Sequence, residues 1–359
     1  RGVEYAYKLM MLGLFTRNRK EGGFDTSSMV NDLFSEMLLT TADHPEDPIH
    51  EWLPKGKIIG KASTTSTYAG SDKFLGSYNQ SESYTNAEKV HIVVDFPTHA
   101  SNGTFNSIYF KNERDQAIKS SYYFIKDHDL YHLLERKYGD KWVVMTDSNR
   151  RVVIVDNDFN ILSETDLVNV KHFDVVGDTL YYIKYDNKNA IYKATLPTLN
   201  DEVQVASHEY KLSSIAYDSL RRRFYTYEDE YGDGGYNLLI YDNEFNLINA
   251  IKQSSKKRNA LVIDGFLYTS NEYSSSSTSN YKYFYDMDSY ELYRFEDNIN
   301  DRLNIIGHDS TKLFIKTSNQ DIGIIPKTYI GSRSLLDAPV TKTETNTMKI
   351  TYDFILPPI

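Results

Sequence analysis

Two histidines lie at a spacing that can bind a metal ion. The sequence HDLYH places His128 and His132 four positions apart, and on a helix this spacing turns both imidazoles toward one ion. Asp129 stands where such a site carries a glutamate general base, and the flanking residues have the pattern of a strand or turn. Residues four apart on a strand are too distant to share one ion. We therefore predict no metal at this pair.

An acidic loop is the second group that could bind a ligand. The segment EDEYGDGGYN (228–237) combines Asp229, Glu230 and Asp233 with glycines, and its carboxylate and carbonyl oxygens could ligate calcium. Its spacing is not that of an EF-hand. A solvated hairpin tip explains the same composition, so the sequence leaves calcium binding at this loop open.

Three aspartates recur at equivalent places in a repeated segment. VIVDNDFNIL (153–162), LIYDNEFNLI (239–248) and FYDMDSYEL (284–292) each read as a strand, an Asp-led turn and another strand. Because Asp156, Asp242 and Asp286 occupy equivalent positions in the repeat, we expect them to form turns. A catalytic pair would instead depart from the repeated pattern. No nucleophile elbow, phosphate-binding loop or dinucleotide fingerprint is present. The sequence predicts a protein that is not an enzyme and binds no cofactor; a glycan-cleaving enzyme with carboxylates in a central channel is the alternative.

Tyrosines and arginines in polar loops are the candidate recognition residues. The chain holds 30 tyrosines and only 2 tryptophans, and tyrosine suits both strands and wet binding surfaces. We expect Tyr231 and Tyr236 in one loop, and Tyr273 and Tyr281 in another, to contact a receptor. The basic run of Arg221, Arg222 and Arg223 is expected to attract a phosphate-bearing polymer. Strand propensity and ordinary solvated charge are the simpler explanations.

A repeat near 43 residues organises the region that carries these groups. Asp156 and Asp242 are 86 positions apart, and Asp286 follows after 44 more. A second recurrent run appears five times: KWVVMT, LYYIKY, RFYTYE, FLYTSNE and LFIKTS. Short strands at this period are typical of propeller blades, whose sheets cover one another's faces. We predict a mainly β protein with a five-bladed propeller, closed by a strand from residues 115–126; a six-bladed ring or an open pair of sandwiches is the alternative.

The flanking segments suggest a smaller second part. Apolar residues at helical spacing predict helices over 4–17 and 27–40, followed by a connector, so that 1–56 forms a helical segment. Runs such as HIVVDF predict strands in 57–114, the propeller spans 115–326, and the segment TYIGSRSLLDAPV reads as a loop within 327–359. The alternating residues of 341–356 predict a strand that pairs with those of 57–110.

Composition excludes several function classes. The chain has no cysteine, which excludes disulfides, thiolate metal sites and thiol nucleophiles. Its formal net charge of −10 argues against a nucleic-acid partner, since counterion release needs clustered Lys and Arg. The one strongly apolar run, LMMLGLF, is too short to span a membrane, so we predict no membrane insertion.

Two segments resemble a known family. Residues 55–83 and 90–110, with Phe96, Thr98 and the Asn-Gly-Thr of 102–104, resemble the region before the propeller in tail-fibre and receptor-binding proteins of phages that infect Gram-positive bacteria. The ending PVTKTETNTMKITYDFIL resembles the C-terminal strand of that family, with matching residues at Thr347, Met348, Ile350, Thr351 and Tyr352. The similarity covers about 70 residues, and its motifs are structural.

The resemblance implies a function that the residues alone do not. It implies a component of the virion tail that assists attachment to the host surface, contacting cell-wall glycopolymer or neighbouring tail proteins through propeller loops. It also implies a homo-oligomer, for which a trimer is one candidate. A purely architectural tail component, whose loops touch only other virion proteins, is a further alternative.

Overall fold

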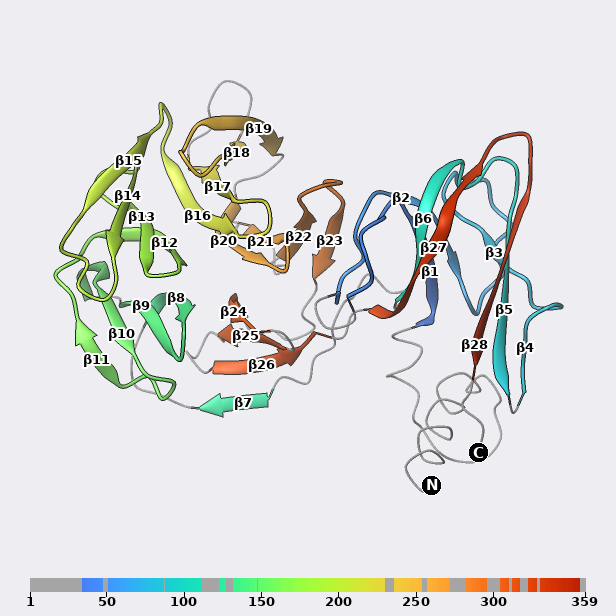
Figure 1. Cartoon of the computed structure of the whole chain (residues 1–359), viewed down its shortest axis with the longest axis horizontal. Coiled ribbons are helices and arrows are strands. Elements are labelled where there is room, and N and C mark those ends of the chain that lie inside the picture. Colours follow the sequence, from blue (N-terminus) through green and yellow to red (C-terminus); the bar gives the residue numbers. More distant parts are fainter. Residues whose placement is uncertain are drawn as a thin grey trace, which may run out of the picture. The chain divides into compact units, whose positions relative to one another are not determined.

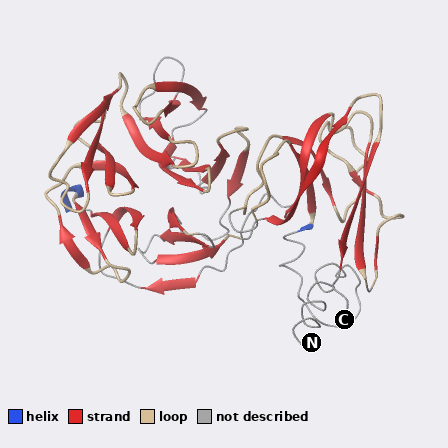
Figure 2. Ribbon diagram, viewed as in Figure 1, coloured by secondary structure: helices blue, strands red, loops and turns tan. Residues whose placement is uncertain are grey.

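The chain divides into two compact units made almost entirely of strands. The computed structural model describes residues 34–355 apart from 48–50, 87, 112–122, 127–131, 147, 230–235, 254–256, 272–281, 296–303, 310–311, 317–321 and 328–329. Unit 1 is drawn from residues 1–117, 288–291 and 328–359, and unit 2 from 118–287 and 292–327 (Figure 1). Strands dominate both units, which confirms the mainly β prediction (Figure 2). Among the described residues, no helix is long and apolar enough to cross a membrane.

Unit 1 contains two antiparallel sheets. The first has the order β2 (Ile58–Ser63), β1 (Glu36–Thr40), β6 (Gly103–Lys111) and β27 (Ile330–Lys342). The second has the order β28 (Met348–Ile355), β5 (Lys89–Phe96) and β3 (Ser77–Tyr78), with β4 (Tyr84–Thr85) also paired to β5. Their apolar faces share one core, which includes Met37, Val94, Phe105 and Phe110. The C-terminal strand β28 thus pairs with β5, one of the strands expected to receive it.

Two predictions in this unit are wrong where the structure describes them. The predicted helix 27–40 is strand β1 over residues 36–40, because every side chain of EMLLT is buried between β2 and β6 and an all-buried run shows no diagnostic period. The rest of this range below 34 and the predicted helix 4–17 lie outside the described residues. The predicted loop after 326 is largely strand β27. Its turn-like residues Asp337 and Pro339 fall in a register shift between Leu335 and Val340, where the missing proline N–H costs no ladder bond.

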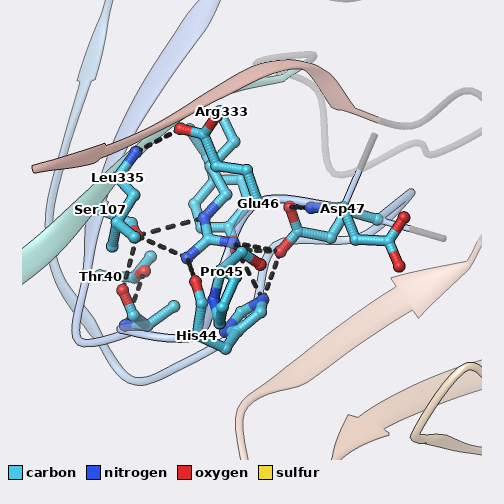
Figure 3. Close-up of polar contacts among 11 residues, drawn as sticks. Thr40, His44, Pro45, Glu46, Asp47, Ser107, Arg333 and Leu335 are labelled. Atoms are coloured by element: carbon cyan, nitrogen blue, oxygen red, sulfur yellow. Dashed lines mark hydrogen bonds and ion pairs between the residues drawn. The ribbon is translucent and has the colours of Figure 1, made fainter. Parts of the chain in front are cut away.

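A buried arginine forms hydrogen bonds that hold the segment between β1 and β2 against the first sheet of unit 1. Arg333 on β27 donates to Glu51 Oε1 at 2.6 Å, to the His44 carbonyl at 2.7 Å and to Ser107 Oγ at 3.0 Å (Figure 3). His44 Nε2 also contacts Glu51 Oε1. Burial raises the pKa of Glu51, but the hydrogen bonds from His44 and Arg333 outweigh burial and hold that pKa below its usual value. The network joins β27, β6 and the segment that holds His44 and Glu51 through buried, paired charges.

Unit 2 contains five four-stranded antiparallel sheets among its described residues. Sheet 1 is β8 (His132–Tyr138), β9 (Lys141–Thr146), β10 (Val152–Val155) and β11 (Ile161–Glu164). Sheet 2 is β12 (Val170–Val176), β13 (Thr179–Lys184), β14 (Ala190–Thr195) and β15 (Val203–Ser207). Sheet 3 is β16 (Leu212–Asp218), β17 (Arg223–Glu228), β18 (Tyr236–Tyr241) and β19 (Leu247–Gln253). Sheet 4 is β20 (Lys257–Ile263), β21 (Phe266–Asn271), β22 (Lys282–Asp286) and β23 (Leu292–Phe295). Sheet 5 is β24 (Asn304–His308), β25 (Lys312–Lys316), β26 (Ile322–Pro326) and β7 (Tyr123–Lys126).

The sheets contact one another in circular order through their first strands. β8 contacts β12, and the series continues through β16, β20 and β24 back to β8 (Figure 1). An apolar cluster with Trp142 and Val153 from sheet 1 and Ile306 and Phe314 from sheet 5 joins the last sheet to the first. The five recurrent runs form the second strand of each sheet, and β7 supplies the fourth strand of sheet 5 from the segment expected to do so.

Each of the three repeated aspartates is followed by a turn. Asp156 Oδ1 accepts from the amides of Asp158 and Asn160, at 2.8 and 2.9 Å. Asp242 Oδ1 accepts in the same way from the amides two and four residues later, at 3.0 and 2.8 Å. This confirms the structural role predicted for both. Asp286 differs, because its side chain is buried and one oxygen lies 3.9 Å from Arg221 Nη2.

Candidate functional site

A pocket with a volume of about 270 Å³ opens where the five first strands of unit 2 meet. Each of these strands contributes to its wall. The polar lining residues are Arg136, Lys137, Asp174, Tyr217, Ser219 and His308, and the aliphatic ones are Val175, Val176, Leu261 and Val262. Apolar walls with a few convergent polar groups are typical of small-molecule sites. We therefore take this pocket as the candidate functional site.

A register shift in every first strand helps to build the pocket. Each of β8, β12, β16, β20 and β24 changes register against the second strand of its sheet, as between His132 and Leu134 on β8 and between Ile305 and Gly307 on β24. Such bulges bend a strand and redirect the side chains that follow. Gly307 also permits a close approach, since a Cβ there would lie 3.2 Å from the Trp142 ring. The repeat thus places residues of five distant segments around one point.

Arg136 is a charged residue of the pocket lining. Its side chain is buried, and its Nε donates to Asp174 Oδ1 at 3.2 Å. Nη1 donates to its neighbour's carbonyl, that of Glu135, and Nη2 donates to the Ala260 carbonyl on β20 at 2.7 Å. One guanidinium therefore joins the first strands of sheets 1, 2 and 4.

Asp174 is held by groups from two sheets. Its Oδ1 also accepts from the Val175 amide at 3.0 Å, and its Oδ2 accepts from the Tyr217 amide at 2.7 Å. Burial raises the pKa of this carboxyl, and Arg136 with the two amides acts against that rise. With both oxygens already engaged, Asp174 is poorly suited to donate or accept a proton during a reaction. Its role here is to position Arg136 and the β16 backbone.

A second buried ion pair lies behind the arginine. Lys316 Nζ on β25 donates to Glu135 Oε1 at 2.6 Å, and both side chains are almost inaccessible. Burial, assisted by the positive charge of Arg136, lowers the pKa of Lys316 to about 7. Neither residue lines the pocket, so we assign this pair to the interior of the ring rather than to the site.

His308 is the one pocket group whose ordinary titration lies near neutral pH. Its Nδ1 lies 3.3 Å from Lys327 Nζ and 3.8 Å from Asp264 Oδ1. Lys327 Nζ also donates to Asp264 Oδ2 at 2.5 Å and to the Asp309 carbonyl. Burial and the Lys327 charge lower the pKa of His308, which Asp264 and Asp309 only partly oppose. These charges favour the neutral imidazole, which carries one N–H donor and one acceptor nitrogen.

None of the described residues predicted to bind a receptor lines this pocket. Arg221 is engaged, because its guanidinium donates to Asp218 Oδ2 at 2.7 Å and to the Gly265 carbonyl at 3.0 Å. Arg222 is exposed and faces the Asn243 amide, whose oxygen can accept from it at 3.1 and 3.0 Å. Arg223 and Tyr236 begin strands β17 and β18 and are half-buried. Tyr231, Tyr273 and Tyr281 lie outside the described residues.

The other candidate ligands are distributed as follows. Asp229 contacts Lys171 Nζ and lies 3.8 Å from Lys188 Nζ, so two lysines neutralise it. Glu230 and Asp233 fall outside the described residues, as does His128, while His132 begins β8. In the part of the chain that the structure describes, no three His, Asp or Glu side chains gather around a common position for a metal ion.

Sequence reasoning missed the pocket because its residues share no local motif. Arg136, Asp174 and His308 stand in three strands that are each apolar on one side and separated by more than thirty residues. The available signal was the charge itself. Four of the five strands that precede a recurrent run contain a charged residue, and a buried charge needs a partner.

Comparisons with known proteins give a distant structural likeness. No protein-family model matches the chain, and no curated protein matches it. Among solved structures, the glutaminyl cyclase of Myxococcus xanthus matches with a TM-score of 0.42 and 12% identity, covering 60% of this chain and 97% of the cyclase. A gluconolactonase of Xanthomonas campestris matches with a TM-score of 0.39 and 10% identity, covering 66% of this chain and 90% of the lactonase.

One prediction is corrected by these comparisons. The sequence led us to expect a protein that is not an enzyme, whereas both neighbours in structure, a glutaminyl cyclase and a gluconolactonase, are enzymes. A missing linear motif does not exclude an enzyme, because sites can be assembled from residues on many strands. At these TM-scores neither neighbour assigns a reaction to this chain.

Proposed function

We propose that the chain is a tail protein of a phage infecting Gram-positive bacteria and that its central pocket engages a phosphate-bearing glycopolymer of the host cell wall. In this proposal unit 2 is a five-bladed propeller, and the protein resides in the virion tail as a homo-oligomer beside other tail proteins. The phage assignment rests on the resemblance of residues 55–83, 90–110 and 339–356 to that family. The pocket is the new element, replacing the tyrosine-rich loops as the main contact.

The charge of the pocket is the observation that carries the proposal. Arg136 and Lys137 contribute two positive charges to the lining, and Asp174 contributes one negative charge. The lining is therefore net positive in a chain whose formal net charge is −10. A locally positive concave site in an acidic protein favours anionic ligands and steers them to that point. Phosphate groups of a wall glycopolymer have the required charge.

The size and remaining walls of the pocket suit one repeating unit. A volume of about 270 Å³ lies just below the range of roughly 300–1,000 Å³ that is common for ligand pockets. Aliphatic side chains such as Val176 and Leu261 can cover the apolar face of a sugar, while Tyr217 and Ser219 offer polar groups. We infer that the pocket binds a terminal or protruding unit rather than a long stretch of polymer.

A pull-down on purified cell walls tests this function. We expect the protein to sediment with intact walls and to stay in solution when the walls have been stripped of their phosphate-bearing glycopolymer. Added glycopolymer should compete with the intact walls. Equal sedimentation with intact and stripped walls would overturn the proposal. Failure to bind either, together with co-assembly with tail proteins, would favour a purely architectural role.

Cleavage of the glycan at the same pocket is the second candidate. The observation that favours it is His308, an imidazole in the pocket lining whose N–H can stabilise the negative charge that develops on a phosphate or sugar oxygen during cleavage. Incubation of the protein with purified wall polymer, followed by chromatography of the soluble fraction, tests it. Release of product by the wild type and loss of release in His308→Ala would establish cleavage, and the absence of product would leave binding alone.

A further inference from the structure

Lys327 fixes the proton arrangement of His308. A lysine ammonium has three N–H donors and no acceptor. The three acceptors around Lys327 Nζ are Asp264 Oδ2, the Asp309 carbonyl and His308 Nδ1. His308 Nδ1 must therefore offer its lone pair, and the proton of the neutral ring lies on Nε2. The Lys327 side chain is buried, whereas the His308 side chain is 30% exposed.

Protonation of Nδ1 would break this arrangement. A proton on Nδ1 would point at the ammonium, and two like charges would then share a buried site. Asp264 Oδ1, at 3.8 Å from Nδ1, and the carboxylate of Asp309, which is 3.4 Å from Lys312 Nζ, act in the opposite direction. Arg136 and Lys137 line the same pocket, where Arg136 is paired with Asp174 and Lys137 Nζ donates to Asn157 Oδ1 at 2.7 Å. The charges around the ring thus favour its neutral form.

We propose that His308 is a constitutively neutral donor whose Nε2–H binds a phosphate oxygen of the ligand, and that Lys327 is the positioning residue that keeps the imidazole in this form. The inference rests on the proposed function for the identity of the ligand, but not for the state of the ring. Nε2 is the polar atom that the imidazole retains for the pocket once Nδ1 is engaged. Arg136 lines the same pocket, so Arg136 and His308 would bind the anion from two different strands.

The state of His308 can be measured without any ligand. In long-range ¹H–¹⁵N spectra of the full chain, selectively labelled on histidine, we expect the His308 ring to show a proton on Nε2 and a lone pair on Nδ1 from pH 5.5 to 8. Assignment comes from the signal lost in His308→Gln. A ring protonated on Nδ1, or one that titrates with the ordinary value near 6.5, would overturn the inference.

Variants test whether Lys327 itself keeps the His308 imidazole neutral. In Lys327→Met combined with Asp264→Asn, which leaves no uncompensated buried carboxylate, we expect His308 to regain an ordinary titration. Lys312→Met removes the lysine that begins β25 and lies 3.4 Å from the Asp309 carboxylate, and it should leave the ring unchanged. If the double variant shows the same neutral ring as the wild type, Lys327 does not position it.

Binding of inorganic phosphate, measured by calorimetry, tests the donor role. We expect His308→Ala to weaken binding about tenfold, as for the loss of one hydrogen bond to a charged group, and His308→Gln to retain most of the affinity because its amide supplies an N–H near the same place. As the pH is varied, the affinity of the wild type should change only as the phosphate itself gains or loses a proton. Undisturbed binding by His308→Ala would contradict the donor role even if the spectra show the expected ring. No phosphate binding by the wild type, with the ring as expected, would overturn the proposed ligand and the donor role but leave the proton arrangement standing.

Discussion

Arg136 on β8 and Asp174 on β12 join two neighbouring sheets of unit 2 through a buried ion pair, with 3.2 Å between Arg136 Nε and Asp174 Oδ1. The same guanidinium reaches the Ala260 carbonyl of a third sheet. The pair thus has two roles: it joins first strands of different sheets, and it places a cation in the lining of the pocket.

Removal of this arginine should destabilise unit 2 strongly. Arg136→Met leaves Asp174 buried without its cation, for which we expect a loss of about 3–5 kcal/mol in the free energy of unfolding. Urea unfolding followed by the fluorescence of Trp142 measures it. Arg151→Met, which removes an exposed ion pair to Glu164, is the matched control and should cost less than about 1 kcal/mol. Equal losses in the two variants would contradict the role given to Arg136.

The Glu51 network predicts a response of unit 1 to acid. The pKa of Glu51 is lower in the folded chain than its ordinary value of 4.5, so its contribution to stability is complete above about pH 4.5 and is lost as the pH falls through the lowered folded value. Glu51→Gln should therefore lose less stability than the wild type between pH 5 and 3, by on the order of 1 kcal/mol. Trp52 fluorescence in a Trp142→Phe background reports on unit 1 alone. A difference between wild type and variant that stays constant over this range would count against the network.

A side chain at position 307 should clash with the Trp142 ring, and a smaller ring should relieve the clash. In Gly307→Ala the new methyl group would lie 3.2 Å from the Trp142 ring, and we expect a cost of about 1–3 kcal/mol. In a Trp142→Phe background the smaller ring should leave room, so the same substitution should cost clearly less. Thermal unfolding of the four proteins gives the coupling between the two sites. Strict additivity would show that Trp142 is not the obstacle.

Much of the strand and turn structure could be predicted because its signals are local. The recurrent runs concentrate apolar residues, and four of them were expected to follow a polar turn. Asp156 and Asp242 bind their own turns through bonds that span four residues or fewer. Strand β1 was mistaken for a helix because both of its faces are buried: Met37 and Leu39 pack in the core shared by the two sheets, and Leu38 packs with Ala42 and Tyr109. Tertiary packing decided that element.

The site could not be predicted in the same way. Arg136 and Asp174 acquire their roles from Ala260 and Tyr217, which lie on other sheets. His308 acquires its role from Lys327, which follows β26 of the same sheet but lies 19 residues away in the sequence. The basic run at Arg221 drew attention because its charges are adjacent in the sequence, yet Asp218 and the Gly265 carbonyl occupy Arg221 in the folded chain. Adjacency in sequence indicated a turn, whereas the pocket depends on which strands the ring brings together.

The measurement that tests the pocket most directly is calorimetric binding of purified, phosphate-bearing wall glycopolymer to Ser219→Trp. Ser219 is exposed on the turn after β16 and lines the pocket, so an indole there fills the space without disturbing the buried ion pairs. Ser207→Trp, on the exposed edge strand β15, is the matched control. The account predicts that Ser219→Trp loses at least tenfold in affinity while Ser207→Trp binds like the wild type; wild-type affinity in Ser219→Trp would contradict it.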